Sequence, residues 1–167
     1  MNRRTLLVAL VNLVVLTATG LAGQSKQKSL QGVWQTVEVT LSGTDARTIA
    51  IPEPRPNLMI VTARHYSRVE VQAEGTRPML ADAAKAGADE LRAVWGPFVG
   101  EAGTYELTAA NEITMRPIAA KNPAVMLPGA FITYSFRMEG DTIWVTQRRN
   151  QKGPFSNPAT IKAVRVE

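Results

Sequence analysis

Short runs in which polar and apolar residues alternate dominate the chain from Leu30 to its end. These runs are rich in Val, Ile, Thr, Tyr, Phe and Trp, and they cover residues 32–41, 57–62, 65–71, 102–108, 112–119, 130–138, 142–148 and 160–166. Alternation with a period of two, in segments of β-branched and aromatic residues, predicts β-strands with one buried face. The sequence therefore predicts eight strands.

The connections between these runs are mostly short and polar. Gly140-Asp141 has the composition of a tight hairpin turn, and short turns are also expected at 62–65 and 109–111. Two proline-rich segments, 52–56 and 153–158, are predicted to be loops because proline lacks the amide donor of a central strand. Only 79–95 has apolar residues at helical spacing, and Gly87 could divide that helix into two.

Strands joined mainly by hairpins, with one helical insertion, favour an all-β fold over a parallel α/β sheet. The chain has no Cys, so its stability cannot come from disulfides and has to come from a packed core or a closed sheet. We therefore predict an eight-stranded antiparallel up-and-down β-barrel. A β-sandwich is the alternative, because the proline-rich loops could cross between two sheets.

The N-terminal segment has the order of a secretory signal peptide. A basic start at 1–4 precedes an apolar run at 6–16 and mostly small residues at 17–23. The sequence thus predicts a signal peptide at 1–22, a polar linker at 23–29 and a barrel domain at 30–167, in a periplasmic or secreted protein. An uncleaved anchor is the alternative, because the apolar stretch approaches the length that spans a bilayer.

The net charge of +5 does not indicate a nucleic-acid partner. The excess of 19 Lys and Arg over 14 Asp and Glu includes Arg3 and Arg4 of the predicted signal peptide, and the other basic residues are scattered. A surface that follows a phosphate backbone needs clustered positive charge. Nor is a membrane barrel favoured, since charged residues interrupt both faces of the predicted strands where a lipid-facing band would have to be apolar.

The residue inventory argues against most enzyme mechanisms. Without Cys there is no thiol nucleophile, and His65 is the only histidine, which excludes a multi-histidine metal site. The sequence has no Gly-x-Ser-x-Gly elbow and no phosphate-binding glycine loop. We predict no catalytic residues, no metal and no cofactor, and we expect His65 in a surface turn. An isomerase or cyclase acting inside a barrel cavity remains an alternative.

Several motifs resemble bacterial lipocalin-like domain proteins over residues 30–167. They are Leu30-x-Gly32-x-Trp34, Trp95-Gly-Pro-Phe98, Gly103-Thr-Tyr-Glu106 and Gly140-Asp-Thr-Ile143, in this order. The resemblance implies an eight-stranded barrel around a small apolar cavity. It also implies that Gly32 and Trp34 close one end, with Arg165 or Arg148 stacked over the indole; a surface position for Arg165 is the alternative.

A ligand site follows if the aromatic, amphipathic strand faces point inward. The lining would then comprise Tyr105, Arg116, Tyr134, Trp144 and Arg148, which suits an apolar molecule with an anionic head. An arginine inside the barrel would need an acid or a ligand carboxylate as its partner. The alternatives are plain core packing for the three aromatic residues and exposed strand faces for the two arginines.

The predicted function is non-covalent binding of a small hydrophobic or amphipathic molecule by an exported lipocalin-like protein. The alternative is a non-catalytic protein-interaction module that uses the proline-rich loops.

Overall fold

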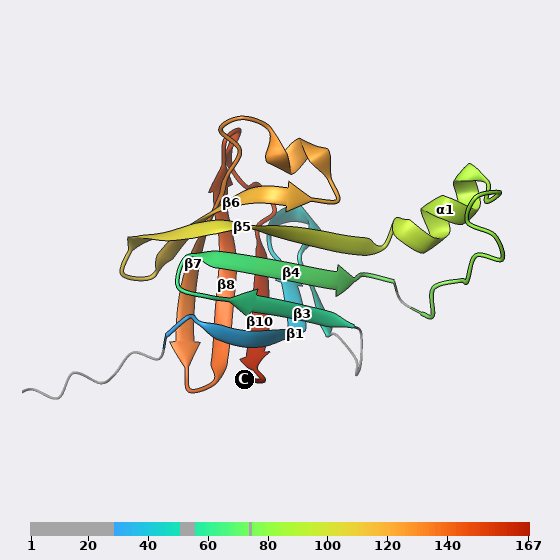
Figure 1. Ribbon diagram of the computed structural model, residues 1–167. Coiled ribbons are helices and arrows are strands. Elements are labelled where there is room, and N and C mark those ends of the chain that lie inside the picture. Colours follow the sequence, from blue (N-terminus) through green and yellow to red (C-terminus); the bar gives the residue numbers. More distant parts are fainter. Residues whose placement is uncertain (1–28, 51–55, 74) are drawn as a thin grey trace, which may run out of the picture.

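The computed structural model describes residues 29–50, 56–73 and 75–167 (Figure 1). The predicted signal peptide, 1–22, and the linker up to residue 28 lie outside the described residues, so these boundaries stay predictions. No helix within the described ranges combines the length and apolar character needed to cross a membrane.

The described chain is mostly β-structure. Its strands are β1 (Gly32–Leu41), β2 (Arg47–Ala50), β3 (Asn57–Val61), β4 (His65–Val71), β5 (Phe98–Ala109), β6 (Glu112–Ala120), β7 (Ile132–Glu139), β8 (Thr142–Asn150), β9 (Gly153–Pro154) and β10 (Ala159–Arg165). The helical elements are α1 (Ala88–Trp95) and the short 3-10 turns η1 (Gly43–Asp45) and η2 (Pro123–Met126). The eight predicted strands all form, while β2 and β9 were not predicted.

Antiparallel pairing closes these strands into a barrel. The order β1-β3-β4-β5-β6-β7-β8 continues to β10 through a β8–β10 ladder, and β10 pairs back to β1. Strands β2 and β9 are additions to β1 and β8, which leaves eight strands in the ring. The predicted antiparallel barrel is confirmed, and the sandwich alternative is wrong because the hydrogen-bonded ring has no break into two sheets.

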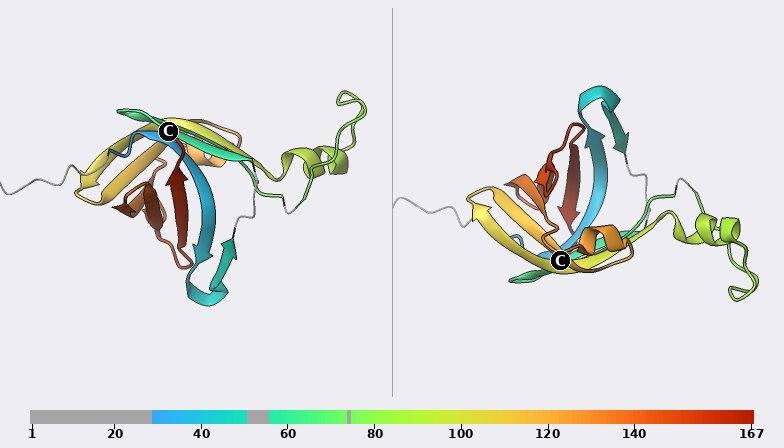
Figure 2. Two further views of the ribbon diagram at one scale, coloured as in Figure 1. Left: turned by 90° about the horizontal axis from the view of Figure 1, so that it is seen from below. Right: turned by 90° about the horizontal axis from the view of Figure 1, so that it is seen from above.

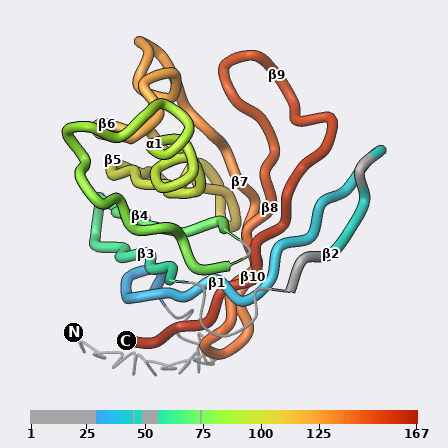
Figure 3. The backbone as a smooth tube through the Cα atoms, turned by 90° about the vertical axis from the view of Figure 1, so that its right-hand side faces the viewer, coloured from blue at the N-terminus to red at the C-terminus, as the bar shows by residue number. Residues whose placement is uncertain are grey.

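Strand β1 pairs with two different strands along one of its edges. Its first residues pair with β3, and its last four pair with β2, so that the β1–β2 hairpin projects from the barrel (Figure 2, Figure 3). The backbone pairing of β1 with β3 ends at Trp34, and beyond it the Asn57 side chain forms hydrogen bonds to the β1 backbone. Its Oδ1 accepts from the Thr36 amide at 2.6 Å, and its Nδ2 donates to the Thr36 carbonyl at 3.1 Å.

The two ends of the barrel differ. Because successive ring strands run antiparallel, the tight turns after β3, β5 and β7 share one end with the C-terminus of β10. The long connections after β1, β4, β6 and β8 share the other end. The shape of this second end therefore depends on the sequences of the long connections.

The helical insertion is shorter than predicted. Helix α1 begins after Gly87, whose amide donates to Glu90 Oε2 at 2.8 Å, and the expected turns before Gly87 are not helical. The helix stands away from the barrel (Figure 1) and buries none of its residues. Its C-terminal end is tied to the barrel by Lys121, whose Nζ donates to the carbonyls of Gly96 at 3.0 Å and Phe98 at 2.8 Å.

Candidate functional site

The barrel encloses a cavity of about 90 Å³. Apolar side chains from β1, β3, β6, β7, β8 and β10 form most of its wall, among them Trp34, Met59, Val61, Ile113, Met115, Ile143, Val145 and Ala163. This volume lies below the several hundred Å³ typical of drug-sized ligand sites. A molecule that fits without rearrangement is therefore small.

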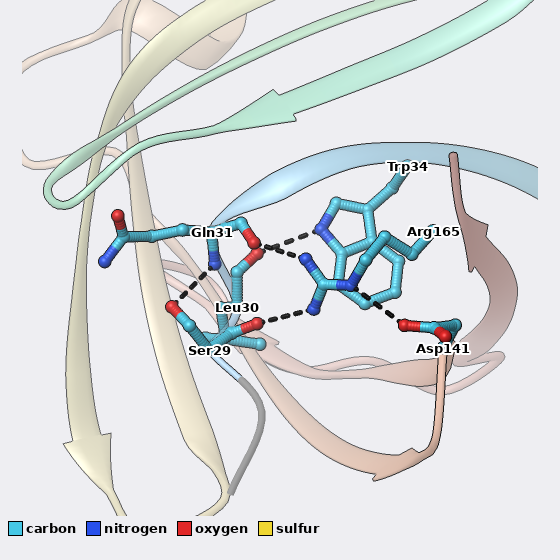
Figure 4. Close-up of polar contacts among 6 residues, drawn as sticks. All are labelled: Ser29, Leu30, Gln31, Trp34, Asp141 and Arg165. Carbon is cyan, nitrogen blue, oxygen red and sulfur yellow. Dashed lines mark hydrogen bonds and ion pairs between the residues drawn. The ribbon is translucent and has the colours of Figure 1, made fainter. Parts of the chain in front are cut away.

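Trp34 on β1 forms the floor of this cavity. Its side chain is buried, and its indole Nε1 donates to the Leu30 carbonyl at 2.9 Å (Figure 4). The Arg165 guanidinium carbon lies 4.2 Å from the centre of the indole ring, which is the geometry of a cation–π contact. The indole therefore closes the barrel with one face in the core and the other under Arg165.

Arg165 joins the chain segments on either side of the floor. Its Nη2 donates to the Ser29 carbonyl at 2.7 Å, its Nη1 donates to the Gln31 carbonyl, and its Nε lies 3.3 Å from Asp141 Oδ1 (Figure 4). The Arg165 side chain is 17% exposed, whereas the side chain of its partner Asp141 is 58% exposed. The structure thus brings Arg165 over Trp34, whereas Arg148 lies exposed on β8. The sequence did not point to Asp141 as part of this group.

Gly32 leaves room for the same guanidinium. Its φ is 142°, and a Cβ at this position would lie 2.6 Å from the Glu167 carbonyl oxygen and would collide with Arg165 Nη1. Only glycine combines this backbone conformation with such a close approach.

The predicted ligand residues separate into two groups. Tyr105 and Tyr134 line the cavity; Tyr134 is part of the buried core cluster, and the partly buried Tyr105 packs against it. Arg116, Trp144 and Arg148 do not line it, so the expected inward direction of these three side chains is wrong.

Strand register explains the error on β8. Ile143 and Val145 face inward, which turns Trp144 outward between Arg137 and Lys162, with the Arg137 guanidinium carbon 3.5 Å from the ring centre. Arg116 on β6 lies on the outer surface, where its Nη2 is 2.7 Å from Glu106 Oε1. Both faces of β8 carry apolar side chains, so alternation alone could not choose the buried one.

An arginine does face the cavity, but it is Arg68 on β4. Arg68 lies directly opposite Glu101 of β5 in the strand register, and its Nη2 is 3.5 Å from Glu101 Oε1. The Tyr66 hydroxyl donates to the same oxygen at 3.4 Å. An interior arginine with an acid partner is the arrangement that the cost of burying a charge requires. The pattern Tyr66-x-Arg68-x-Glu70 was the sequence signal that could have identified this polar inner face.

Burial changes the acid–base properties of this group. Loss of solvation, reinforced by the Glu101 carboxylate, raises the pKa of Tyr66 far above its ordinary value, so the phenol remains a hydrogen-bond donor. Burial likewise raises the pKa of Tyr134. Burial alone would lower the pKa of Arg68, but the electrostatic interactions with Glu101, Tyr134, Glu70 and Tyr66 together outweigh it, so the pKa is raised. The Arg68 Nε is buried and has no hydrogen-bond partner in the described part of the chain.

The lone histidine lies outside the cavity. His65 begins β4, is exposed as expected, and borders a shallow polar groove on the outer surface together with Arg64 and Arg116. Among the described residues, no cluster of three or more His, Cys, Asp or Glu side chains is placed to hold a metal ion.

Comparison with known proteins adds three solved structures. No family model matches the chain, and no curated protein matches it. An uncharacterized protein from Bacteroides eggerthii aligns with a TM-score of 0.44 at 9% identity, over 81% of this chain and 99% of its own. A lipocalin-like protein from Bacteroides uniformis aligns with a TM-score of 0.44 at 13% identity, over 81% of this chain and 97% of its own. A redesigned β-barrel aligns with a TM-score of 0.38 at 12% identity, over 83% of this chain and 92% of its own.

The fold therefore rests on the strand pairing of this chain itself. The family resemblance of the sequence motifs stays a prediction.

Proposed function

We propose that this chain is an exported binding protein that holds one small, largely apolar molecule in its barrel without transforming it. The observation that carries the proposal is the cavity of about 90 Å³, enclosed by a closed ring of strands and walled mostly by aromatic and aliphatic side chains. Enclosed apolar sites with a few convergent polar groups are the usual form of small-molecule sites. Export is inferred from the basic, apolar and small-residue order of the N-terminal segment.

Binding without chemistry is supported by the groups around the cavity. Its titratable side chains are Arg68, Glu70, Glu101 and the three tyrosines, and the histidine lies outside it. Burial holds the Tyr66 and Tyr134 phenols in their neutral form, and Glu101 is engaged by Arg68 and Tyr66. These groups can orient a ligand and satisfy its polar atoms.

Native mass spectrometry of the protein, gently purified from cells that export it, tests the proposal. We expect a bound mass that organic solvent releases, and apolar probes that change the fluorescence of Trp34 in the cavity floor. A protein without bound mass, whose fluorescence no small apolar compound alters, would overturn the proposal.

A matched pair of variants locates the binding. Val145 faces the cavity and its neighbour Thr146 faces outward, where its hydroxyl lies 2.9 Å from that of Thr160. Val145→Phe should fill the cavity and abolish binding, whereas Thr146→Phe should leave it intact. Overpacking costs about 1–3 kcal/mol, so thermal melting is measured on both variants to verify that each is folded.

A protein-interaction module is the second candidate, and helix α1 favours it. The helix projects from the barrel and exposes 37% of Leu91 and 52% of Trp95. Replacing both residues with Ala would abolish capture of a partner protein if the helix binds one. The same change should leave the cavity probes bound as before.

A further inference from the structure

The charge of the cavity wall indicates which head group a ligand carries. Among the described residues that line it, one is positive, Arg68, and two are negative, Glu70 and Glu101. All three project from the neighbouring strands β4 and β5, so the charged groups gather on one side of a mostly apolar chamber. With all three ionised, this wall carries one excess negative charge.

The negative charge of Glu101 is already compensated by other groups of this wall. It receives the Arg68 guanidinium at 3.5 Å and the Tyr66 hydroxyl at 3.4 Å, and its side chain is only 12% exposed. The charge of the single guanidinium is thus balanced by the carboxylate that lies opposite it in the strand register, although its Nε has no hydrogen-bond partner among the described residues.

Glu70 carries the excess charge. It lies two residues after Arg68 on the same face of β4, at the barrel end that carries the long connections. Its carboxylate has no hydrogen bond and no ion pair within 4 Å in the described part of the chain, although it interacts electrostatically with Arg68 at longer range. The side chain is half-buried, which makes an unpaired charge more costly than on an open surface.

We infer that the cavity selects small apolar molecules that carry a cationic amine, and discriminates against apolar carboxylic acids. This inference rests on the proposed function. An ammonium group placed beside Glu70 would donate hydrogen bonds to its carboxylate and neutralise the wall. A ligand carboxylate would instead meet a wall with one excess negative charge, whose only arginine already forms an ion pair with Glu101. The anionic head expected from Arg116 and Arg148 loses its basis, since neither lines the cavity.

Three probes that differ only in the head group test the inference. Hexylamine, hexan-1-ol and hexanoate share one alkyl chain and are cationic, neutral and anionic at neutral pH. Titration calorimetry with the wild-type protein should rank them in this order of affinity, with hexylamine at least tenfold tighter than hexanoate.

The variant Glu70→Gln assigns the preference to one carboxylate. It should weaken hexylamine about tenfold, leave hexan-1-ol unchanged and remove most of the discrimination against hexanoate. Glu139→Gln is the matched control, because Glu139 is exposed on the outer surface and pairs with Arg137 there. This control should behave like the wild-type protein.

The possible outcomes distinguish a failure of the amine preference from a failure of the proposed binding function. Binding of hexan-1-ol with hexanoate equal to or tighter than hexylamine would overturn the amine preference and leave small-molecule binding standing. If none of the three probes binds, the proposed function fails with it. The order of the three affinities for the wild-type protein tests the inference even if Glu70→Gln does not fold.

Discussion

Arg68 on β4 and Glu101 on β5 face each other inside the barrel, with 3.5 Å between Nη2 and Oε1. The pair lies in the cavity wall, where each charge is shielded from most of the solvent that would otherwise stabilise it. The stability of the barrel and the proposed ligand preference therefore both involve the charged groups of this wall.

Removing Glu101 should destabilise the barrel strongly. Glu101→Ala leaves Arg68 without its counter-charge, and breaking a buried pair costs about 3 kcal/mol of unfolding free energy. Glu106→Ala is the control, since the Glu106–Arg116 pair is half-exposed and such pairs contribute about 1 kcal/mol or less. Urea denaturation measures both losses, and equal losses would show that the Arg68–Glu101 pair is effectively solvated.

Removing the Arg165 side chain should loosen the floor of the barrel. Arg165→Ala loses the stack on Trp34 and the bonds to Ser29, Gln31 and Asp141, which we expect to cost about 2–3 kcal/mol. Arg149→Ala, which loses a guanidinium 5.5 Å from the Phe131 ring centre on an exposed strand face, should cost less than about 1 kcal/mol. Chemical denaturation followed by indole fluorescence checks this, and a stable Arg165→Ala protein with unchanged emission would contradict it.

Gly32→Ala should lower the stability of the protein by more than backbone strain alone would. The methyl group would collide with Arg165 and the Glu167 carbonyl, in addition to a strain of about 1–3 kcal/mol for an L-residue at this φ. Gly129→Ala isolates the strain, because Gly129 has a φ of 77° and open space around it. We expect a clearly larger fall in melting temperature for Gly32→Ala than for Gly129→Ala. Similar falls would mean that the Arg165 side chain moves aside without a cost in stability.

Alkaline pH should destabilise the protein through its tyrosines. Burial raises the pKa of Tyr66 and Tyr134 in the folded state, so above the ordinary tyrosine pKa of about 10 the unfolded chain releases protons that the folded chain keeps. The unfolding free energy is therefore unaffected by these groups at lower pH and falls as the pH rises above about 10, by about 1.4 kcal/mol per pH unit for each group. Denaturation curves across this range measure the slope.

The variant Tyr66→Phe identifies one source of that slope. It removes one of the two buried phenols, so its stability should fall less steeply above pH ~10. Tyrosinate absorbance of the folded wild-type protein should rise mainly on unfolding. A slope unchanged by the substitution would mean that Tyr66 does not retain its proton.

The sequence by itself determined the barrel. Period-two alternation, β-branched residues and tight turns such as Gly140-Asp141 are local properties, and they identified all eight ring strands. The barrel-closing role of Gly32 and Trp34 was expected from the resemblance of the motif, and the structure places Trp34 in the cavity floor under Arg165. The extent of α1 was overestimated, because the helix begins only after Gly87, which is its N-cap residue.

Only the tertiary structure decided which face of each strand is inside. Trp144 and Ile143 are both apolar, and the pairing of β8 with β7 and β10 placed Ile143 in the core and Trp144 under Arg137. The opposition of Arg68 and Glu101 depends on a register between strands that are separated by the whole helical insertion. A shift of one residue reverses every side chain of a strand, so the composition of the cavity wall is a property of long-range pairing that alternation along one strand does not encode.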